Sequence, residues 1–135
     1  MSGLFVSLIC LTWVQAIQQD VSAADILQRL DLNSFPNSTG PRKVAGWKYP
    51  ADWSFTVLRE EGGSAVLERP GAWAMSLRII RRTEDGIIVC FFDHAQNGGN
   101  YSARSALRIV GDGAGGYRVA EEVEDPTCEP LPGQG

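Results

Sequence analysis

The sequence predicts a mainly β (α+β) fold: a six-stranded antiparallel meander that forms a curled sheet or a partly closed small barrel, with one short amino-terminal helix and one disulfide. Fifteen glycines and seven prolines in 135 residues favour short strands and turns over long helices. Ile87 to Phe92 is an apolar run, rich in β-branched and aromatic residues, between two turn-forming stretches. Such a run indicates a central strand covered on both faces. Short turns separate the strands, and strands joined this way are antiparallel because parallel neighbours need long crossovers.

The amino-terminal stretch predicts an export signal. Leu4 to Val14 is apolar apart from two hydroxyl residues, and it is shorter than the roughly 20 residues that a membrane-spanning helix needs. Small residues that suit signal cleavage follow at Ala16 and at Ala23. We expect cleavage after Ala16, with cleavage after Ala23 as the alternative, and no membrane span once the signal is removed. The predicted organisation is a signal peptide, one exported β-domain and a flexible tail, over residues 1–16, 17–128 and 129–135.

A short helix is predicted near the start of the exported domain. Ser22 and Asp25 fit a capping box, in which the hydroxyl and the acid satisfy each other's backbone groups. Apolar residues then recur at helical spacing, so residues 23–31 are predicted to form an amphipathic helix. Cleavage after Ala16 keeps the Ser22 cap, which is the reason to prefer that position.

Six strands are predicted after the helix. The first is indicated by Trp53, Phe55 and Val57, which alternate with polar residues in the way typical of a half-buried strand. The predicted strands cover residues 53–57, 64–68, 73–79, 87–92, 101–110 and 117–123.

The hydrophobic pattern also predicts the register of the last two strands. Ile109 is placed opposite Val119, because a slip of one residue would turn Arg108 toward the core. The same register pairs Arg104 with Glu124 on the other face of the sheet.

The cysteines support export. Removal of the signal also removes Cys10, which leaves Cys90 and Cys128 as an even pair in an oxidising compartment. No Cys-x-x-Cys spacing is present, and one histidine with two cysteines does not complete a zinc site. We therefore predict a disulfide that fastens the carboxyl-terminal segment to the central strand, with the chain crossing the end of the strand between them. The predicted location is secreted or periplasmic, with no metal and no cofactor.

Asp93 and His94 are the only place where an acid and an imidazole are neighbours. With Ser102 or Ser105 they outline a hydrolytic triad. Adjacent strand residues point to opposite faces, however, and the sequence has no Gly-x-Ser-x-Gly motif. The glycine-rich stretch 111–116 lacks the Lys-Ser/Thr of a phosphate-binding loop, so we interpret it as a hairpin loop.

Charge and aromatic content narrow the class of partner. The net charge is −4, and residues 121–135 hold five acids and no base, so the body of the protein is near neutral and gives no footprint for nucleic acid. Asn37 and Asn100 begin glycosylation sequons that matter only in a eukaryotic secretory pathway. Aromatic residues that are candidate contacts for a ligand or partner are Trp47, Tyr49, Trp53, Trp73 and Tyr101.

These observations favour an exported, non-catalytic binding or interaction module whose partner is an unknown protein or a small apolar ligand. The first alternative is a carrier of a small apolar ligand in a partly closed barrel. The second is a small hydrolase that uses Asp93 and His94. An enclosed apolar cavity would favour the carrier, polar groups converging on His94 would favour the enzyme, and a filled core with an exposed apolar patch would favour the interaction module.

Overall fold

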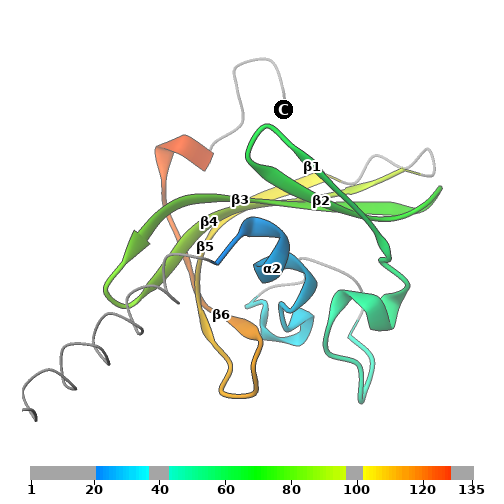
Figure 1. Cartoon of the computed structure of the whole chain (residues 1–135), viewed down its shortest axis with the longest axis horizontal. Helices are drawn as coiled ribbons and strands as arrows, with labels where there is room; N and C mark the ends of the chain where they lie inside the picture. Colours follow the sequence, from blue (N-terminus) through cyan, green and yellow to red (C-terminus); the bar gives the residue numbers. More distant parts are fainter. Residues whose placement is uncertain (1–20, 37–42, 97–101, 129–135) are drawn as a thin grey trace, which may run out of the picture.

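The six strands form one antiparallel sheet in the order β1-β2-β3-β4-β5-β6, as the sequence predicts (Figure 1). The structure is a computed structural model, and it describes residues 21–36, 43–96 and 102–128. This strand order confirms the predicted meander, and the sheet is curled and does not close into a barrel. The strands are β1 Val57–Glu61, β2 Ser64–Arg69, β3 Trp73–Thr83, β4 Gly86–Ala95, β5 Ser102–Gly111 and β6 Tyr117–Val123.

The predicted position of the first strand is wrong. Residues Pro50–Trp53 form a 3-10 helix, η2, and β1 begins only at Val57. Pro50 favours the first turn of this helix, and Ser54 ends it in the left-handed conformation with φ of 68°. Trp53 and Phe55 are both buried, which is the spacing expected of a strand. Here the spacing arises because Trp53 ends η2 and Phe55 follows the left-handed Ser54.

β4 is the central strand that the apolar run predicts. Val89 and Phe91 are buried on one face, and Ile88 and Cys90 are buried on the other. The strand is longer than predicted and continues to Ala95, because backbone pairing with β3 and β5 extends beyond the apolar run.

Helix α2, Ala23–Gln28, covers the concave face of the sheet (Figure 1). The Ser22 hydroxyl accepts a hydrogen bond of 3.1 Å from the Asp25 amide, so Ser22 is the predicted cap. The helix ends three residues earlier than predicted because Leu30 leaves it to form a parallel bridge with Tyr117 of β6. A 3-10 turn, η1 (Leu32–Ser34), follows and packs beside β6. The core between these elements and the sheet is built from apolar side chains, chiefly Ile26, Leu27, Leu30, Phe35, Met75, Leu77, Val89, Phe91, Leu107 and Ile109.

The predicted register of β5 and β6 holds at one end and fails at the other. Ile109 lies opposite Val119 as predicted, but the register shifts between Arg108 and Ile109. Ala120 is the extra residue at this β-bulge, so the predicted pairing of Arg104 with Glu124 does not occur. Arg108 lies opposite Glu121 instead and forms an ion pair with it at 3.2 Å.

The predicted disulfide joins Cys90 and Cys128, whose Sγ atoms are 2.09 Å apart. It lies on the face of the sheet away from α2, where the 3-10 turn η3, Pro126–Cys128, packs on β5 (Figure 1). The predicted route past the end of the intervening strand needs correction. Because β4 extends to Ala95, Cys90 lies in mid-strand opposite Ala106, and Cys128 covers the face of β5 rather than its end.

Asp125 holds the turn that carries Cys128. Its carboxylate accepts hydrogen bonds from the Thr127 amide at 3.0 Å and the Thr127 hydroxyl at 2.7 Å, and it forms an ion pair with Arg81. The Thr127 hydroxyl, followed by the Arg81 guanidinium, lowers the pKa of Asp125 to about 2. The carboxyl-terminal segment is thus fastened to the sheet both covalently and electrostatically.

Candidate functional site

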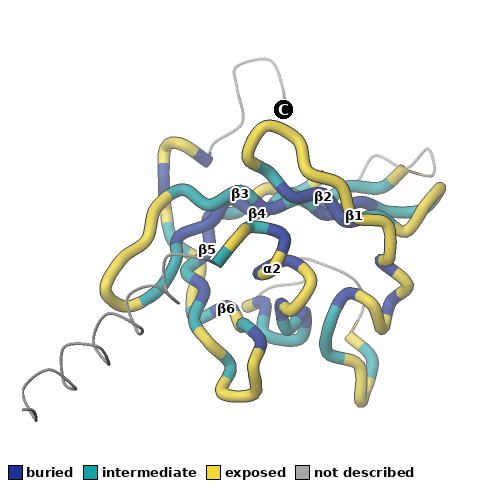
Figure 2. Tube along the Cα trace, in the orientation of Figure 1, coloured by how far each residue is buried: buried dark blue, intermediate teal, exposed yellow. Residues whose placement is uncertain are grey.

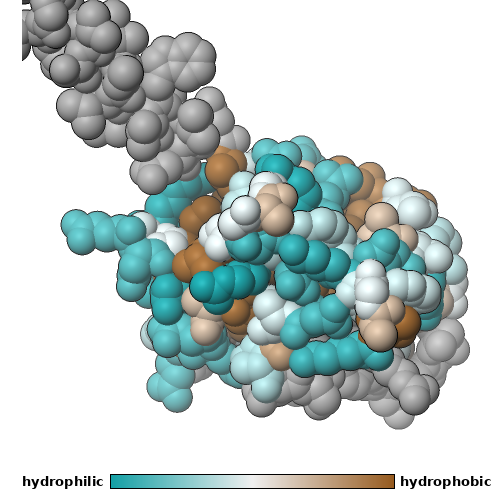
Figure 3. All heavy atoms as spheres, turned by 90° about the horizontal axis from the view of Figure 1, so that it is seen from below, coloured by the Kyte–Doolittle hydropathy of each residue, from teal (hydrophilic) through white to brown (hydrophobic). Residues whose placement is uncertain are grey.

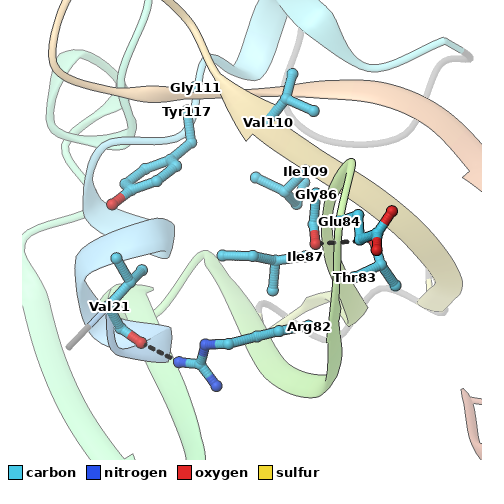
Figure 4. A pocket seen from close by; sticks show the side chains of 10 residues that line it. All are labelled: Val21, Arg82, Thr83, Glu84, Gly86, Ile87, Ile109, Val110, Gly111 and Tyr117. Carbon is cyan, nitrogen blue, oxygen red and sulfur yellow. Dashed lines mark hydrogen bonds between the residues drawn. The ribbon is translucent and has the colours of Figure 1, made fainter. Parts of the chain in front are cut away.

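An open, mainly apolar groove lies where the described chain begins. Its volume is about 640 Å³, and its walls come from Val21, from the turn between β3 and β4, and from the turn-proximal ends of β5 and β6 (Figure 4). Hydrophobic residues also gather at the surface beside the start of the described chain in Figure 3. The groove is lined by Val21, Arg82, Thr83, Glu84, Gly86, Ile87, Ile109, Val110, Gly111 and Tyr117. We call this hollow the Val21 groove.

Strand pairing places the apolar floor of the Val21 groove. Ile87 of β4 lies opposite Ile109 of β5, and Tyr117 begins β6 beside them. Gly86 allows the close approach of β4 to β5 at this point, because a Cβ atom there would lie 2.7 Å from the Ile109 carbonyl oxygen. Figure 4 shows the side chains of Ile87 and Ile109 between Tyr117 on one side and Arg82 on the other.

Two arginines beside the groove interact with residues of its wall. Arg82 donates a hydrogen bond to the Val21 carbonyl oxygen, which fixes the start of α2 against β3. The guanidinium of Arg29 lies 5.2 Å from the centre of the Tyr117 ring, within range of a cation–π interaction. The space between these groups is bounded by aliphatic side chains, so it suits apolar groups better than charged ones.

The glycine-rich stretch 111–116 is the turn between β5 and β6, and Asp112 organises it. The Asp112 carboxylate accepts hydrogen bonds from the amides of Ala114 (2.7 Å) and Gly116 (2.9 Å) and from the Tyr49 hydroxyl (2.9 Å). Lys48 completes the cluster with an ion pair at 3.0 Å. The Ala114 amide, followed by Lys48, holds the pKa of Asp112 well below its usual range. All of these contacts are within the protein, so Asp112 acts as a structural tie.

Asp93 and His94 do not assemble a triad. Asp93 is fully buried on the α2 side of the sheet and accepts a hydrogen bond from the Trp73 indole. His94 faces the opposite side, because neighbouring strand residues alternate. Ser102 lies opposite His94 and shares its face, whereas Ser105 shares the face of Asp93. Neither face therefore carries the acid, the imidazole and a serine together.

The aromatic candidates are distributed over the protein rather than around one hollow. Trp53 is buried, and Trp47, which is 40% exposed, packs edge-on against it with ring centres 5.4 Å apart. The Tyr49 hydroxyl is occupied at the β5–β6 turn, and the Trp73 indole is occupied in the core. Tyr101 lies outside the described residues. A role for these side chains in partner contact stays a prediction.

In residues 21–36, 43–96 and 102–128, no group of three or more His, Cys, Asp or Glu side chains could hold a metal ion. No helix in the same ranges is both long enough and apolar enough to cross a membrane.

Comparison with protein families, with curated proteins and with solved structures found no match to this chain. The geometry of its own residues is therefore the basis for any statement about function.

Sequence reasoning missed the Val21 groove. Ile87 and Ile109 are predicted strand residues of the core, but whether they line a hollow depends on how two hairpins meet. The available signal was Gly86, which stands directly before an apolar strand, where a glycine often marks close backbone approach.

Proposed function

We propose that the protein is an exported, non-catalytic binding module, and that its Val21 groove receives apolar side chains of a partner protein. The observation that carries the proposal is the groove itself: a volume of about 640 Å³ with half-buried Val21, Ile87 and Tyr117 in its walls. The adjoining core is filled by Leu30, Val89 and its neighbours. A filled core beside an open apolar surface is typical of an interaction site.

The shape of the groove favours a protein partner over a free small ligand. Its volume lies within the range of small-molecule sites, roughly 300–1,000 Å³. Such sites bury most of the ligand surface, roughly 70–90%, whereas this groove is open to solvent. Side chains that belong to a partner can enter an open groove while the partner's own backbone stays hydrated. The carrier of a small apolar ligand remains the second candidate, supported by the volume.

The separation of Asp93 from His94 supports a non-catalytic role. A hydrolytic triad needs the base to be oriented by the acid, and these two side chains lie on opposite faces of β4. The Asp93 carboxylate is instead engaged by Trp73 in the core.

Export, to a periplasm or to the cell exterior, is supported by the Cys90–Cys128 disulfide, because such bonds persist in oxidising compartments. The structure adds a reason to expect cleavage after Ala16. Val21 is held by Arg82, and Ser22 caps α2, so cleavage after Ala23 would remove both contacts. Mass spectrometry of the protein from its native host should find Ile17 as the first residue. An intact Met1 would contradict the proposal of cleavage.

The groove is tested by comparing two charged variants in binding experiments. Val21→Asp places a carboxylate in the groove wall, and Ala51→Asp places the same charge at an exposed position of η2, away from it. Proteins captured from the native source by wild type should be retained by Ala51→Asp. They should bind Val21→Asp at least about tenfold more weakly, because a buried valine contact contributes roughly 1.5–3 kcal/mol. Equal capture by both variants would contradict a role for the groove.

A fluorescent apolar probe, N-phenyl-1-naphthylamine, separates the second candidate from the first. Saturable binding of one probe per protein, lost in Val21→Asp and kept in Ala51→Asp, would support the carrier. Capture of a partner without saturable probe binding would support the interaction module.

A further inference from the structure

We propose that β1 is a second docking surface, at which an extended segment of a partner protein adds a seventh strand to the sheet. The two edges of the sheet differ. The β6 edge is occupied at residues 117–119: the Asp31 amide donates to the Tyr117 carbonyl at 2.7 Å, the Tyr117 amide donates to the Arg29 carbonyl at 2.8 Å, and the Val119 amide donates to the Ser34 hydroxyl at 2.8 Å. Among the described residues, β1 pairs with β2 on one side and has no backbone partner on the other.

The side chains of β1 are exposed and include apolar groups that another strand could cover. All five residues of the strand are exposed, as Figure 2 shows along β1. Val57 is 45% exposed and Leu58 is 36% exposed, and they point to opposite faces of the sheet. A large apolar side chain on each face of an open edge strand is a liability in an isolated protein, and pairing with another strand removes it.

The charges of β1 define the chemistry of the partner strand. Arg59 is already engaged by Glu61 at 2.8 Å and by Glu68, both on its own face. Glu60 lies on the other face with Leu58 and has no ion-pair partner among the described residues. An added strand therefore fits when it places an apolar residue beside Leu58 and, two residues away, a lysine or arginine beside Glu60.

A second copy of this chain is a poor occupant. Two β1 strands related by a two-fold axis overlap fully only when Arg59 lies opposite its own copy. That register also places Leu58 beside Glu60 and leaves Val57 beside Glu61. Like charges directly opposite each other are destabilising, so the strand's own sequence disfavours edge-to-edge dimers.

The test uses two synthetic peptides and the full chain with its disulfide intact. The first peptide, acetyl-TKTVTVT-amide, carries one lysine two residues from a valine. The second, acetyl-TETVTVT-amide, carries glutamate in place of the lysine. Peptide is titrated into isotope-labelled protein, and backbone amide shifts are followed by NMR. The lysine peptide should shift the amides of Val57–Glu61 and should bind about 2- to 25-fold more tightly than the glutamate peptide, since a cross-strand attraction is replaced by a repulsion.

Charge reversal at Glu60 provides the matched control. Glu60→Lys should reverse the preference between the two peptides, and Val21→Asp in the Val21 groove should leave it unchanged. A lysine peptide that is N-methylated on alternate residues should fail to bind, because it cannot form the backbone ladder. Shifts confined to groove residues, or no shift of β1 amides at several millimolar peptide, would overturn the proposal. If β1 amide shifts depended on protein concentration without peptide, and sedimentation showed dimers, the occupant of the β1 edge would be a second copy of this chain. That result would also overturn the proposal.

Discussion

Removal of the Cys90–Cys128 disulfide should strongly destabilise the protein. The bridge closes a loop with a sequence separation of 38 residues and fastens η3 to the central strand. In the chain-entropy model, closing a loop of this length lowers the entropy of the unfolded chain and so raises its free energy by about 4 kcal/mol at 25 °C. A small domain has a total stability of roughly 5–15 kcal/mol, so this loss is a large share of it.

Urea unfolding of the mature chain from Ile17 measures the effect. Wild type is compared with Cys90→Ala/Cys128→Ala and with wild type in reducing agent, at one pH and temperature. Both proteins without the disulfide should lose about 4 kcal/mol in the free energy of unfolding. The alanine variant should be slightly less stable than the reduced wild type, because two buried sulfur atoms are also removed. The slope of the transition should rise when the bridge is absent, since the uncrosslinked unfolded chain exposes more surface.

Two results would refute this reasoning. Two free thiols in the denatured, unreduced mature protein would show that the bridge does not form. A loss below about 1 kcal/mol with the bridge present in wild type would show that restriction of the unfolded chain is not its main contribution. A thiol count therefore precedes the stability measurement.

Three further predictions concern other contacts. The pKa of Asp125 is lowered from 3.8 to about 2, so its stabilising effect is complete above about pH 4 and is lost as the pH falls toward 2. The difference in melting temperature between wild type and Asp125→Asn should shrink over that interval, and a constant difference would contradict the assignment. Gly116→Ala should cost about 1–3 kcal/mol, because its Cβ would lie 2.5 Å from the Tyr49 hydroxyl, whereas Gly111→Ala, with open space around it, should be nearly neutral in the same thermal unfolding assay. His94→Ala should keep the fold and leave any hydrolysis of generic ester, peptide or glycoside substrates unchanged, and turnover that disappears with this substitution would contradict the non-catalytic assignment.

The order of the strands could be predicted because strong local signals specify it. The apolar run around Val89 indicated a central strand, and Tyr117–Val123 was bounded correctly because turn-forming glycines precede it. Cys90 and Cys128 could be paired because the predicted signal includes Cys10, the only other cysteine of the sequence. Each of these inferences depends on nearest neighbours in sequence or on a count of one residue type.

The remaining features depend on packing that sequence patterns do not carry. Trp53 and Phe55 are buried by a 3-10 turn, yet their spacing is that of a strand. The β-bulge at Ala120 shifts the β5–β6 register although no glycine or proline marks it. The Val21 groove arises where two hairpins and the start of α2 meet. Val21 and Tyr117 line the same groove although they lie near opposite ends of the described sequence.

The walls of the Val21 groove are fixed by contacts within the protein, and this is an argument for the proposed binding role. Arg82 fastens Val21, Arg108 donates to the Asp85 carbonyl at 2.9 Å in the β3–β4 turn, and Asp112 fastens the β5–β6 turn. A surface held in one conformation before the partner arrives loses less conformational entropy on association, so more of the apolar contact energy contributes to affinity. The Arg82 guanidinium at the rim is already paired within the protein, which lowers the desolvation cost of covering it. The chain thus joins an apolar groove to rigid walls, a combination that favours stable association with a partner's apolar side chains.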